Sequence, residues 1–211
     1  MSKMLDKISK AVIQGDDDEI AGLTQDALDE GLVAKEILQG GLMPGMDYVG
    51  VEFKAGRMYV PEVLLSARTM KGSMAVLEPL LAEGESLVVG KAIMGTVEGD
   101  LHDIGKNLVA MMMEGAGFHI VDLGTDVTPD AFVDAVKKEN PDIVGMSALL
   151  TTTMRNMGRT IDALKEAGLR DQVKVMIGGA PVTSDFAEQI GADGSASSAP
   201  AAVDLAKSFV G

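Results

Sequence analysis

Residues 87–123 have the sequence LVVGKAIMGTVEGDLHDIGKNLVAMMMEGAGFHIVDL, and this stretch decides the fold of the second half of the chain. A short apolar run at 87–94 is followed by a glycine-containing polar loop, by apolar residues at helical spacing, and by a second apolar run at 118–123. Such short apolar runs are typical of buried strands, and the segment between them is long enough for a crossover helix. The stretch therefore predicts a strand–helix–strand unit with two parallel strands.

The same alternation continues to the end of the chain. The apolar runs DIVGMSAL at 142–149 and VKVMIGG at 173–179 each lie between amphipathic segments. Strands joined by crossover helices are buried on both faces, which explains why these runs are continuous. We expect residues 86–211 to form an α/β domain, a Rossmann-like (flavodoxin-like) doubly wound sheet of four or five parallel strands with helices on both faces.

Residues 1–85 follow a different pattern. Apolar residues recur at intervals of three and four, as in Leu5, Ile8 and Val12, and glycines separate the segments. Pro61 suits the first turn of a last long helix that runs toward Leu81. The pattern predicts a bundle of four or five helices, joined to the sheet domain by a linker at residues 83–90.

The composition limits the classes of function. The chain has 211 residues, of which 46% are apolar, and a formal net charge of −14. Because an acidic chain without a basic patch repels phosphate backbones and anionic lipid, we expect neither nucleic acid nor a membrane as a partner. The chain has no cysteine, no apolar segment of a secretory signal and no run approaching about 18 apolar residues. We therefore expect a cytoplasmic protein.

Polar loops follow each of the predicted strands. They are GDLHDIG at 99–105, DLGTDVTP at 122–129, SALLTTT at 147–153 and GGAPVT at 178–183. In doubly wound sheets, ligands bind beside the carboxyl ends of the strands, where these loops lie. The sequence therefore predicts one site that is assembled from several loops.

His102 is one of two histidines in the chain and stands two residues after Asp100. A carboxylate at that spacing can accept an imidazole N–H, which fixes the tautomer and raises the basicity of the other nitrogen, as around metal-ligating histidines. The chain lacks cysteine and has only His119 besides, so one histidine cannot form a protein-only metal site. A metal bound to His102 would need a macrocycle to supply its other ligands.

A simpler interpretation makes 99–105 an ordinary loop. In that case Asp103 caps a helix that starts near Ile104, Gly105 allows tight packing of this helix on the sheet, and His102 faces solvent. The later loops argue against this interpretation. In them, Ser147-Ala148-Leu149 and Gly178-Gly179 follow Gly105 at the separations of a known pattern of three motifs.

Together these residues resemble the cobalamin-binding proteins that carry Asp-x-His-x-x-Gly, Ser-x-Leu and Gly-Gly motifs. The chain is similar to the corrinoid proteins of methyltransferase systems and to the cobalamin module of methionine synthase. The resemblance extends to the helical half, where EFKAGRMYVPEVLLSARTMKGSMAVLEPL at 52–80 is similar to the cap domain of that family. It therefore implies a helical cap domain at 1–85 and a cobalamin-binding domain at 86–211.

The resemblance implies cobalamin bound base-off, with its nucleotide base displaced from cobalt and His102 as the lower axial metal ligand. Asp100 would hold His102 by a hydrogen bond, and Thr153 would complete the relay. Phe53 and Val60 would shield the upper face of the cofactor, although both residues also suit the core of a helical bundle. The cofactor-binding positions of the sheet domain would be Gly99, Asp100, Leu101, His102, Asp103, Gly105, Ser147, Leu149, Thr151, Gly178, Gly179 and Ala199.

Small side chains dominate GSASSAPAA at 194–202, the segment that contains Ala199. In the family this region lies near the far wall of the cavity that takes the nucleotide tail. The segment therefore has two interpretations, as part of a cavity wall or as a plain surface loop.

The function that the resemblance implies is methyl carriage on cobalt, alternating between cob(I) and methylcob(III). A donor-specific methyltransferase would load the protein, and a second methyltransferase would unload it onto tetrahydrofolate or coenzyme M. A reductive activator protein would be a further partner. The chain alone would not be a complete enzyme, because no barrel domain for the donor or acceptor is recognisable in it.

Three other functions remain open at this point. A cobalamin-dependent sensor or regulator would need a basic DNA-reading segment, and none is recognisable before Leu5 or after Phe209. The cobalamin subunit of a radical mutase is disfavoured by the helical cap. A sheet domain without any cofactor is the last alternative.

Overall fold

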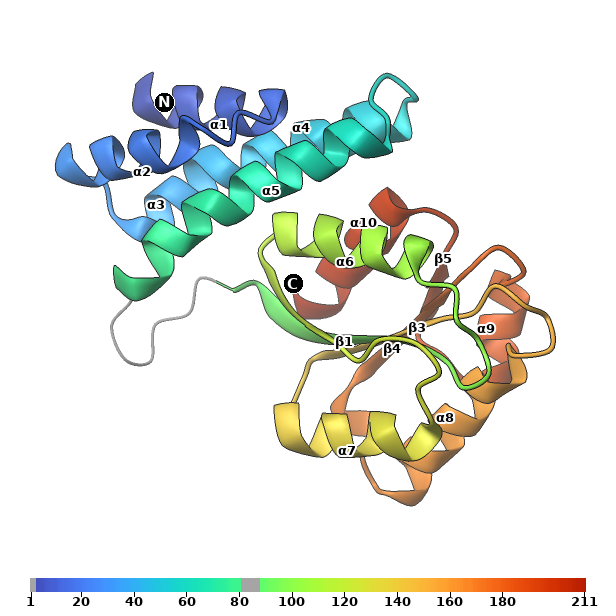
Figure 1. Ribbon diagram of the computed structural model, residues 1–211. Helices are drawn as coiled ribbons and strands as arrows, with labels where there is room; N and C mark the ends of the chain where they lie inside the picture. Colours follow the sequence, from blue (N-terminus) through green and yellow to red (C-terminus); the bar gives the residue numbers. More distant parts are fainter. Residues whose placement is uncertain (1–2, 81–87) are drawn as a thin grey trace. The chain divides into compact units, whose positions relative to one another are not determined.

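A computed structural model describes residues 3–80 and 88–211 of the chain. These residues form two compact units, one that ends at Val88 and also takes in Glu114–Gly117, and one made of Val89–Met113 and Phe118–Gly211. One unit consists of helices, and the other contains a five-stranded sheet with its covering helices (Figure 1). The linker predicted at 83–90 lies mostly outside the described residues.

The helical unit is held together by apolar stripes that face one core. Fully buried side chains at helical spacing, such as Ile8, Ile20, Ile37, Leu42 and Met70, form its centre. Phe53 and Val60 do not belong to this core. The helical elements are α1 (Lys3–Gln14), α2 (Ile20–Asp29), α3 (Ala34–Ile37), the π-helix η1 (Leu38–Leu42), α4 (Met43–Lys54), α5 (Val60–Leu77) and the 3-10 helix η2 (Glu78–Leu80).

Glycines allow α1 to approach the segment from η1 to α4 closely. A Cβ atom added to Gly40 would lie 2.8 Å from Cδ1 of Leu5, and one added to Gly45 would lie 2.9 Å from Cβ of Val12. Larger side chains would push the two helices apart, since packed interiors leave little free volume. The glycines that separate segments in the sequence pattern therefore also set the spacing of the helices.

The sheet unit is a doubly wound α/β fold. Its strands are all parallel and lie in the order β2-β1-β3-β4-β5, which is the flavodoxin-like order. The strands are β1 (Gly90–Thr96), β2 (Phe118–Asp122), β3 (Ile143–Ser147), β4 (Lys174–Gly178) and β5 (Gly194–Ala196). The helices are α6 (Ile104–Gly115), α7 (Pro129–Glu139), α8 (Arg155–Glu166), α9 (Ser184–Ile190) and α10 (Ala199–Val210), with the 3-10 helix η3 (Arg170–Gln172) before β4.

Helices cover both faces of the sheet. Phe132 of α7, Ile161 of α8 and Ala187 of α9 are buried in one cluster with strand residues such as Ile93 and Val175. Figure 1 shows α6 and α10 on the opposite face. Thr128, Thr183 and Ser198 cap α7, α9 and α10, each by accepting a backbone N–H three residues ahead.

The strand register aligns the carboxyl ends of the strands. Thr96 of β1 pairs with Ser147 of β3, which pairs with Gly178 of β4, and Gly178 pairs with Ala196 of β5. Strand order reverses between β1 and β3, and the loops that follow these two strands lie at this switch point. This is the place where a flavodoxin-like sheet binds its ligand.

The predicted fold class is confirmed: a helical N-terminal part precedes a parallel sheet of five strands with helices. The surface-loop interpretation of 194–202 is wrong, because this segment contains the edge strand β5 and the first turn of α10. Within 3–80 and 88–211, no helix is both long and apolar enough to cross a membrane.

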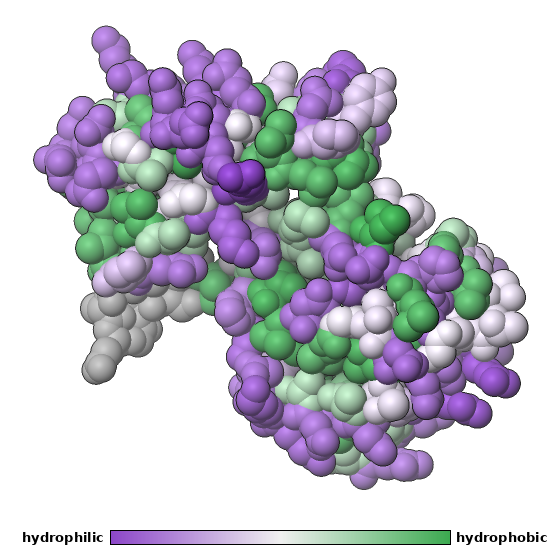
Figure 2. Space-filling model, viewed as in Figure 1, coloured by the Kyte–Doolittle hydropathy of each residue, from purple (hydrophilic) through white to green (hydrophobic). Residues whose placement is uncertain are grey.

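Hydrophilic and apolar residues both lie on the face of each unit that Figure 2 shows. The large apolar residues that are exposed include Val51 and Tyr59 in the helical unit, and Leu101 and Ile104 in the sheet unit. Leu101 is 72% exposed and Ile104 is 82% exposed. Leu101 lies in the loop that follows β1, and Ile104 is the first residue of α6 after this loop.

Candidate functional site

The loop between β1 and α6 places Asp100 inside the protein and His102 at its surface. Gly99 has a φ of 81°, a left-handed conformation that glycine adopts without strain. The hydroxyl of Thr96, at the end of β1, donates a hydrogen bond to the carbonyl oxygen of His102 over 2.9 Å. The Asp100 residue is completely buried, whereas 52% of the His102 side chain is exposed.

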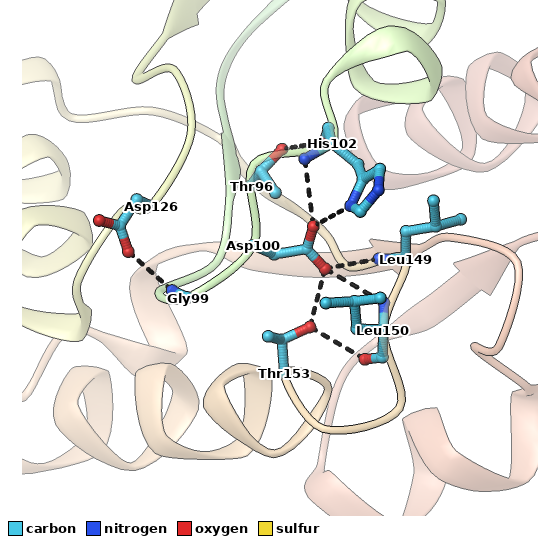
Figure 3. A network of polar contacts seen from close by, with 8 residues as sticks. All are labelled: Thr96, Gly99, Asp100, His102, Asp126, Leu149, Leu150 and Thr153. Atoms are coloured by element: carbon cyan, nitrogen blue, oxygen red, sulfur yellow. Dashed lines mark hydrogen bonds and ion pairs between the residues drawn. The ribbon is translucent and has the colours of Figure 1, made fainter.

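The carboxylate of Asp100 accepts hydrogen bonds from two loops (Figure 3). Its Oδ1 atom accepts from the His102 ring nitrogen Nδ1 over 2.7 Å and from the His102 backbone N–H over 3.1 Å. Its Oδ2 atom accepts from the backbone N–H groups of Leu149 and Leu150, over 2.8 and 3.1 Å, and from the Thr153 hydroxyl over 2.7 Å. The carboxylate therefore joins the loop after β1 to the loop after β3.

These bonds keep the carboxyl group ionised. Burial raises the pKa of Asp100, but the hydrogen bonds from His102, Thr153 and Leu149 outweigh it and hold the pKa well below its usual range. An ionised carboxylate can only accept hydrogen bonds, so Nδ1 of His102 must carry a proton. In a neutral imidazole this leaves the lone pair of Nε2 unprotonated and able to bind a metal.

The surroundings of Nε2 suit a metal that brings its own ring of ligands. No group of three or more histidine, cysteine or acidic side chains that could hold a metal occurs in the described part of the chain. Leu101 and Ile104 are largely exposed, and so is 42% of Leu149, which gives the site an apolar rim. A cobalt ion held in a corrin ring would fit this donor set, because the ring itself supplies nitrogen ligands, and the methyl groups of the ring could pack on the apolar rim.

Gly105 does not have the packing role that the simpler interpretation of the loop gives it. A Cβ atom added to Gly105 would meet no described atom within 4 Å, so packing of α6 on the sheet does not require glycine there. Asp103 precedes the first residue of α6, as expected for a cap, and its Oδ2 atom accepts a hydrogen bond from the Asn107 amide over 3.1 Å. The missing side chain at position 105 leaves free space beside the histidine loop.

Contacts within the protein itself explain the glycines at 178 and 179. Gly179 has a φ of 127°, and an added Cβ atom would collide with the backbone carbonyl of Ala148. A Cβ atom on Gly178 would lie 3.2 Å from the carbonyl oxygen of Ala196. The close approach of neighbouring loops therefore already requires Gly179, whether or not a ligand passes nearby.

The remaining predicted positions lie on several elements. Ser147 is half-buried at the end of β3, and Thr151 is exposed in the following loop. Ala199 is buried in the first turn of α10. Phe53 and Val60 belong to the helical unit, near the end of α4 and at the start of α5.

Two features of this edge were not identified from the sequence. Nζ of Lys106, a buried residue, lies 2.6 Å from each carboxylate oxygen of Asp122 and 2.6 Å from the amide oxygen of Asn107, which ties the first turn of α6 to the end of β2. Asp126 has a φ of 55° and bonds to Gly99. The only sequence signal for Asp126 was an aspartate two residues after a glycine in a loop, since aspartate tolerates left-handed backbone.

Comparisons with known proteins identify the family of the chain. Residues 90–204 match a family model described as a B12 binding domain, and residues 4–78 match a second model with that description. The chain is 46% identical to a corrinoid protein of Desulfitobacterium hafniense (strain Y51), over 99% of this chain and 98% of that protein. It is 43% identical to the dimethylamine corrinoid protein of Methanosarcina barkeri, over the full length of both.

Solved structures give the same result. The methanol:cobalamin methyltransferase complex of Methanosarcina barkeri contains a chain that is 29% identical, with a TM-score of 0.89, over 99% of this chain and 80% of that one. A cobalamin-binding protein from Desulfitobacterium hafniense DCB-2 is 35% identical, with a TM-score of 0.80, over 98% of both chains. The chain belongs to the cobalamin-binding corrinoid proteins of methyltransferase systems, which confirms the resemblance.

Asp100 should make the stability of the folded protein depend on pH in the acidic range. Its pKa in the folded state lies below its ordinary value of 3.8, so its contribution is complete above that value and is lost as the pH falls through the folded pKa. Asp100→Asn has no charge to lose and places an amide N–H where only acceptors fit. We expect its free energy of unfolding to be lower than that of the wild type at about pH 7. This difference, the margin between the two proteins, should shrink below about pH 4.

Urea unfolding of both proteins across this pH range measures the margin. Subtracting one from the other cancels the contributions of all other titrating groups, which the two proteins share. A margin that stays constant down to about pH 2.5 would contradict the assignment of the lowered pKa to Asp100.

Proposed function

We propose that this protein carries a methyl group on the cobalt of a bound corrinoid between two methyltransferases. One enzyme would transfer the group from a methylated donor, and the other would pass it to tetrahydrofolate or coenzyme M. The observation that carries this proposal is the half-exposed His102 imidazole: a buried carboxylate holds its Nδ1 atom, and its Nε2 atom has no hydrogen-bond partner among the described residues. When bound, cobalt would supply the centre that accepts and releases the methyl group.

We propose His102 as the lower axial ligand, with the nucleotide base of the cofactor displaced. The Asp100 carboxylate holds the proton on Nδ1, which directs the lone pair of Nε2 outward. A second proton, on Nε2, would prevent coordination. Ligation therefore requires that the imidazole carry a single proton, on the Nδ1 atom that Asp100 holds.

Thr153 helps to hold the Asp100 carboxylate. Its hydroxyl lies 2.7 Å from Oδ2 of Asp100 and 2.9 Å from the carbonyl oxygen of Leu150, and a hydroxyl has one proton to donate. Donation to the ionised carboxylate is the stronger bond, because one partner is charged. A turn of the hydroxyl toward Leu150 would leave Oδ2 of Asp100 with only the backbone donors of Leu149 and Leu150.

We assign the rest of the site by position. Ser147, Thr151, Gly178, Gly179 and Ala199 would receive the nucleotide tail, supported by their place beside the carboxyl ends of β3, β4 and β5. In the helical unit, Phe53 and Val60 would cover the methyl-bearing face. Both lie outside the core of that unit, which leaves them available for this role.

The donor class we propose is methylated amines. The relatives that support it are a dimethylamine corrinoid protein at 43% identity and a trimethylamine corrinoid protein of Methanosarcina acetivorans at 42%. The methanol complex is more distant, at 29%. These relatives also favour a methyl carrier over a cobalamin-dependent sensor. A reductive activator protein would complete the set of partners.

The axial ligand can be tested directly. In protein loaded with cobalamin and labelled with nitrogen-15 histidine, the paramagnetic form of cobalt should show the hyperfine splitting of a nitrogen-15 ligand. We expect His102→Ala to abolish this splitting. Asp100→Asn should weaken ligation about 10- to 100-fold, because an amide N–H facing Nδ1 moves the imidazole proton to Nε2.

His119→Ala is the matched control, since His119 lies exposed on β2 and should leave the spectrum unchanged. Splitting from the nucleotide base in the wild type, or unchanged splitting in His102→Ala, would refute the proposed ligation.

Gly105 and Gly179 should respond differently to alanine. Gly105→Ala fills empty space, so the thermal midpoint of the ligand-free protein should stay constant or rise, while its affinity for cobalamin falls. Gly179→Ala should destabilise the ligand-free protein itself, because its Cβ atom meets the Ala148 carbonyl. Calorimetry and cobalamin titration separate the two effects. If Gly105→Ala binds cobalamin as the wild type does, the free space does not serve the cofactor.

The donor class is tested with methyltransferases encoded beside this protein. We expect methylation of the reduced, loaded protein by a methylated amine and none by methanol, followed by transfer to tetrahydrofolate or coenzyme M with a second enzyme. The His102→Ala protein serves as the control for ligand-dependent transfer. Loading by methanol alone would overturn the donor class and leave the carrier role intact.

A further inference from the structure

Asp126, in the loop between β2 and α7, has an unusual backbone conformation. Asp126 and Asn140 are the non-glycine residues with positive φ in the described ranges, at 55° and 45°. Asn140 ends α7 as a left-handed C-cap, and its N–H bonds the carbonyl of Val136. Asp126 ends no helix. Left-handed backbone costs energy for a residue other than glycine and persists where surrounding contacts hold it.

The contacts that hold Asp126 are made with the site loop. Its Oδ1 atom accepts the N–H of Gly99 over 2.7 Å (Figure 3). Its own N–H donates to the carbonyl oxygen of Asp100 over 3.0 Å. The two bonds therefore hold the peptide group before Gly99 and the peptide group after Asp100. In Figure 3, Asp126 lies on the opposite side of Gly99 from His102.

The loop that carries Asp126 is itself anchored to β1. The carbonyl of Gly124 accepts the N–H of Thr96 over 2.9 Å, and the N–H of Val127 donates to the carbonyl of Thr96 over 2.9 Å. Asp126 therefore lies between two fixed points of the chain. A residue anchored in this way can hold the backbone of Asp100 in one place.

We infer that Asp126 is a positioning residue for the His102 ligand. The carboxylate of Asp100 is held by the loop after β3, and its backbone is held by Asp126 from the loop after β2. With both ends fixed, the Oδ1 atom of Asp100 has one position, and the imidazole bonded to it has one orientation. The effect on cobalt ligation rests on the proposed function, whereas the effect on the loop does not.

Two properties of Asp126 are needed, and substitutions separate them. Asn keeps an acceptor oxygen and tolerates left-handed backbone. Gly keeps the backbone conformation and loses the acceptor, while Ala loses both. We expect Asp126→Asn to behave as the wild type, Asp126→Gly to be impaired, and Asp126→Ala to be impaired most. Asp126→Gly keeps the test valid if Asp126→Ala fails to fold.

The first experiment uses the ligand-free chain. Loss of the acceptor should accelerate hydrogen exchange of the Gly99 amide about tenfold in Asp126→Gly and Asp126→Ala, with little change in Asp126→Asn. The proton NMR signal of the His102 Nδ1–H group should broaden or shift in the same two variants. Faster exchange at Gly99 with an unchanged His102 signal would overturn the positioning role, and so would unchanged exchange.

The matched control is Asn140→Ala, which removes the other left-handed non-glycine residue at a helix end outside the network around Asp100. It should lower the thermal midpoint and leave both signals unchanged, since a merely structural effect does not reach His102. In cobalamin-loaded protein, the nitrogen hyperfine signal of His102 should weaken in Asp126→Ala and persist in Asn140→Ala. If His102→Ala itself retains that signal, the proposed ligation fails, while the result in the ligand-free chain still decides the role of Asp126.

Discussion

A buried negative charge organises the sheet unit. The Asp100 carboxylate is fully enclosed, and in the described part of the chain no lysine or arginine pairs with it. Burying an ionised group is costly unless hydrogen bonds replace the lost water, and here side-chain and backbone donors from His102 and from residues 149–153 do so. The loops after β1 and β3 are therefore held together by the need to satisfy one charge.

The same arrangement would make the proposed axial ligand both fixed in orientation and accessible. A corrin can reach an imidazole only if the ring faces outward, and an outward-facing side chain normally samples several rotamers. The buried partner restricts the ring through Nδ1, while half of the His102 side chain stays exposed. A short tether to a rigid acceptor thus combines exposure with orientation, which is the general use of outer partners around metal-binding histidines.

The features that could be predicted from the sequence are those formed by residues close to one another in the chain. The alternation of apolar runs predicted the parallel sheet, because buried strands and crossover helices leave a regular pattern. The spacing of Asp100, His102 and Gly105 identified the candidate site, because one turn contains all three. The pattern missed the clamp between Lys106 and Asp122 and the left-handed Asp126, because these contacts depend on which loops become neighbours.

The sequence by itself therefore determined the fold class, the strand ends where the candidate site lies, and the histidine that we propose as a metal ligand. Only the tertiary structure decided which donors satisfy Asp100, that Gly179 is needed by the carbonyl of Ala148, and that Gly105 leaves free space. The physical reason is range. Periodicity and local spacing record burial and turns, whereas hydrogen bonds across 50 residues exist only after the strands have paired in register.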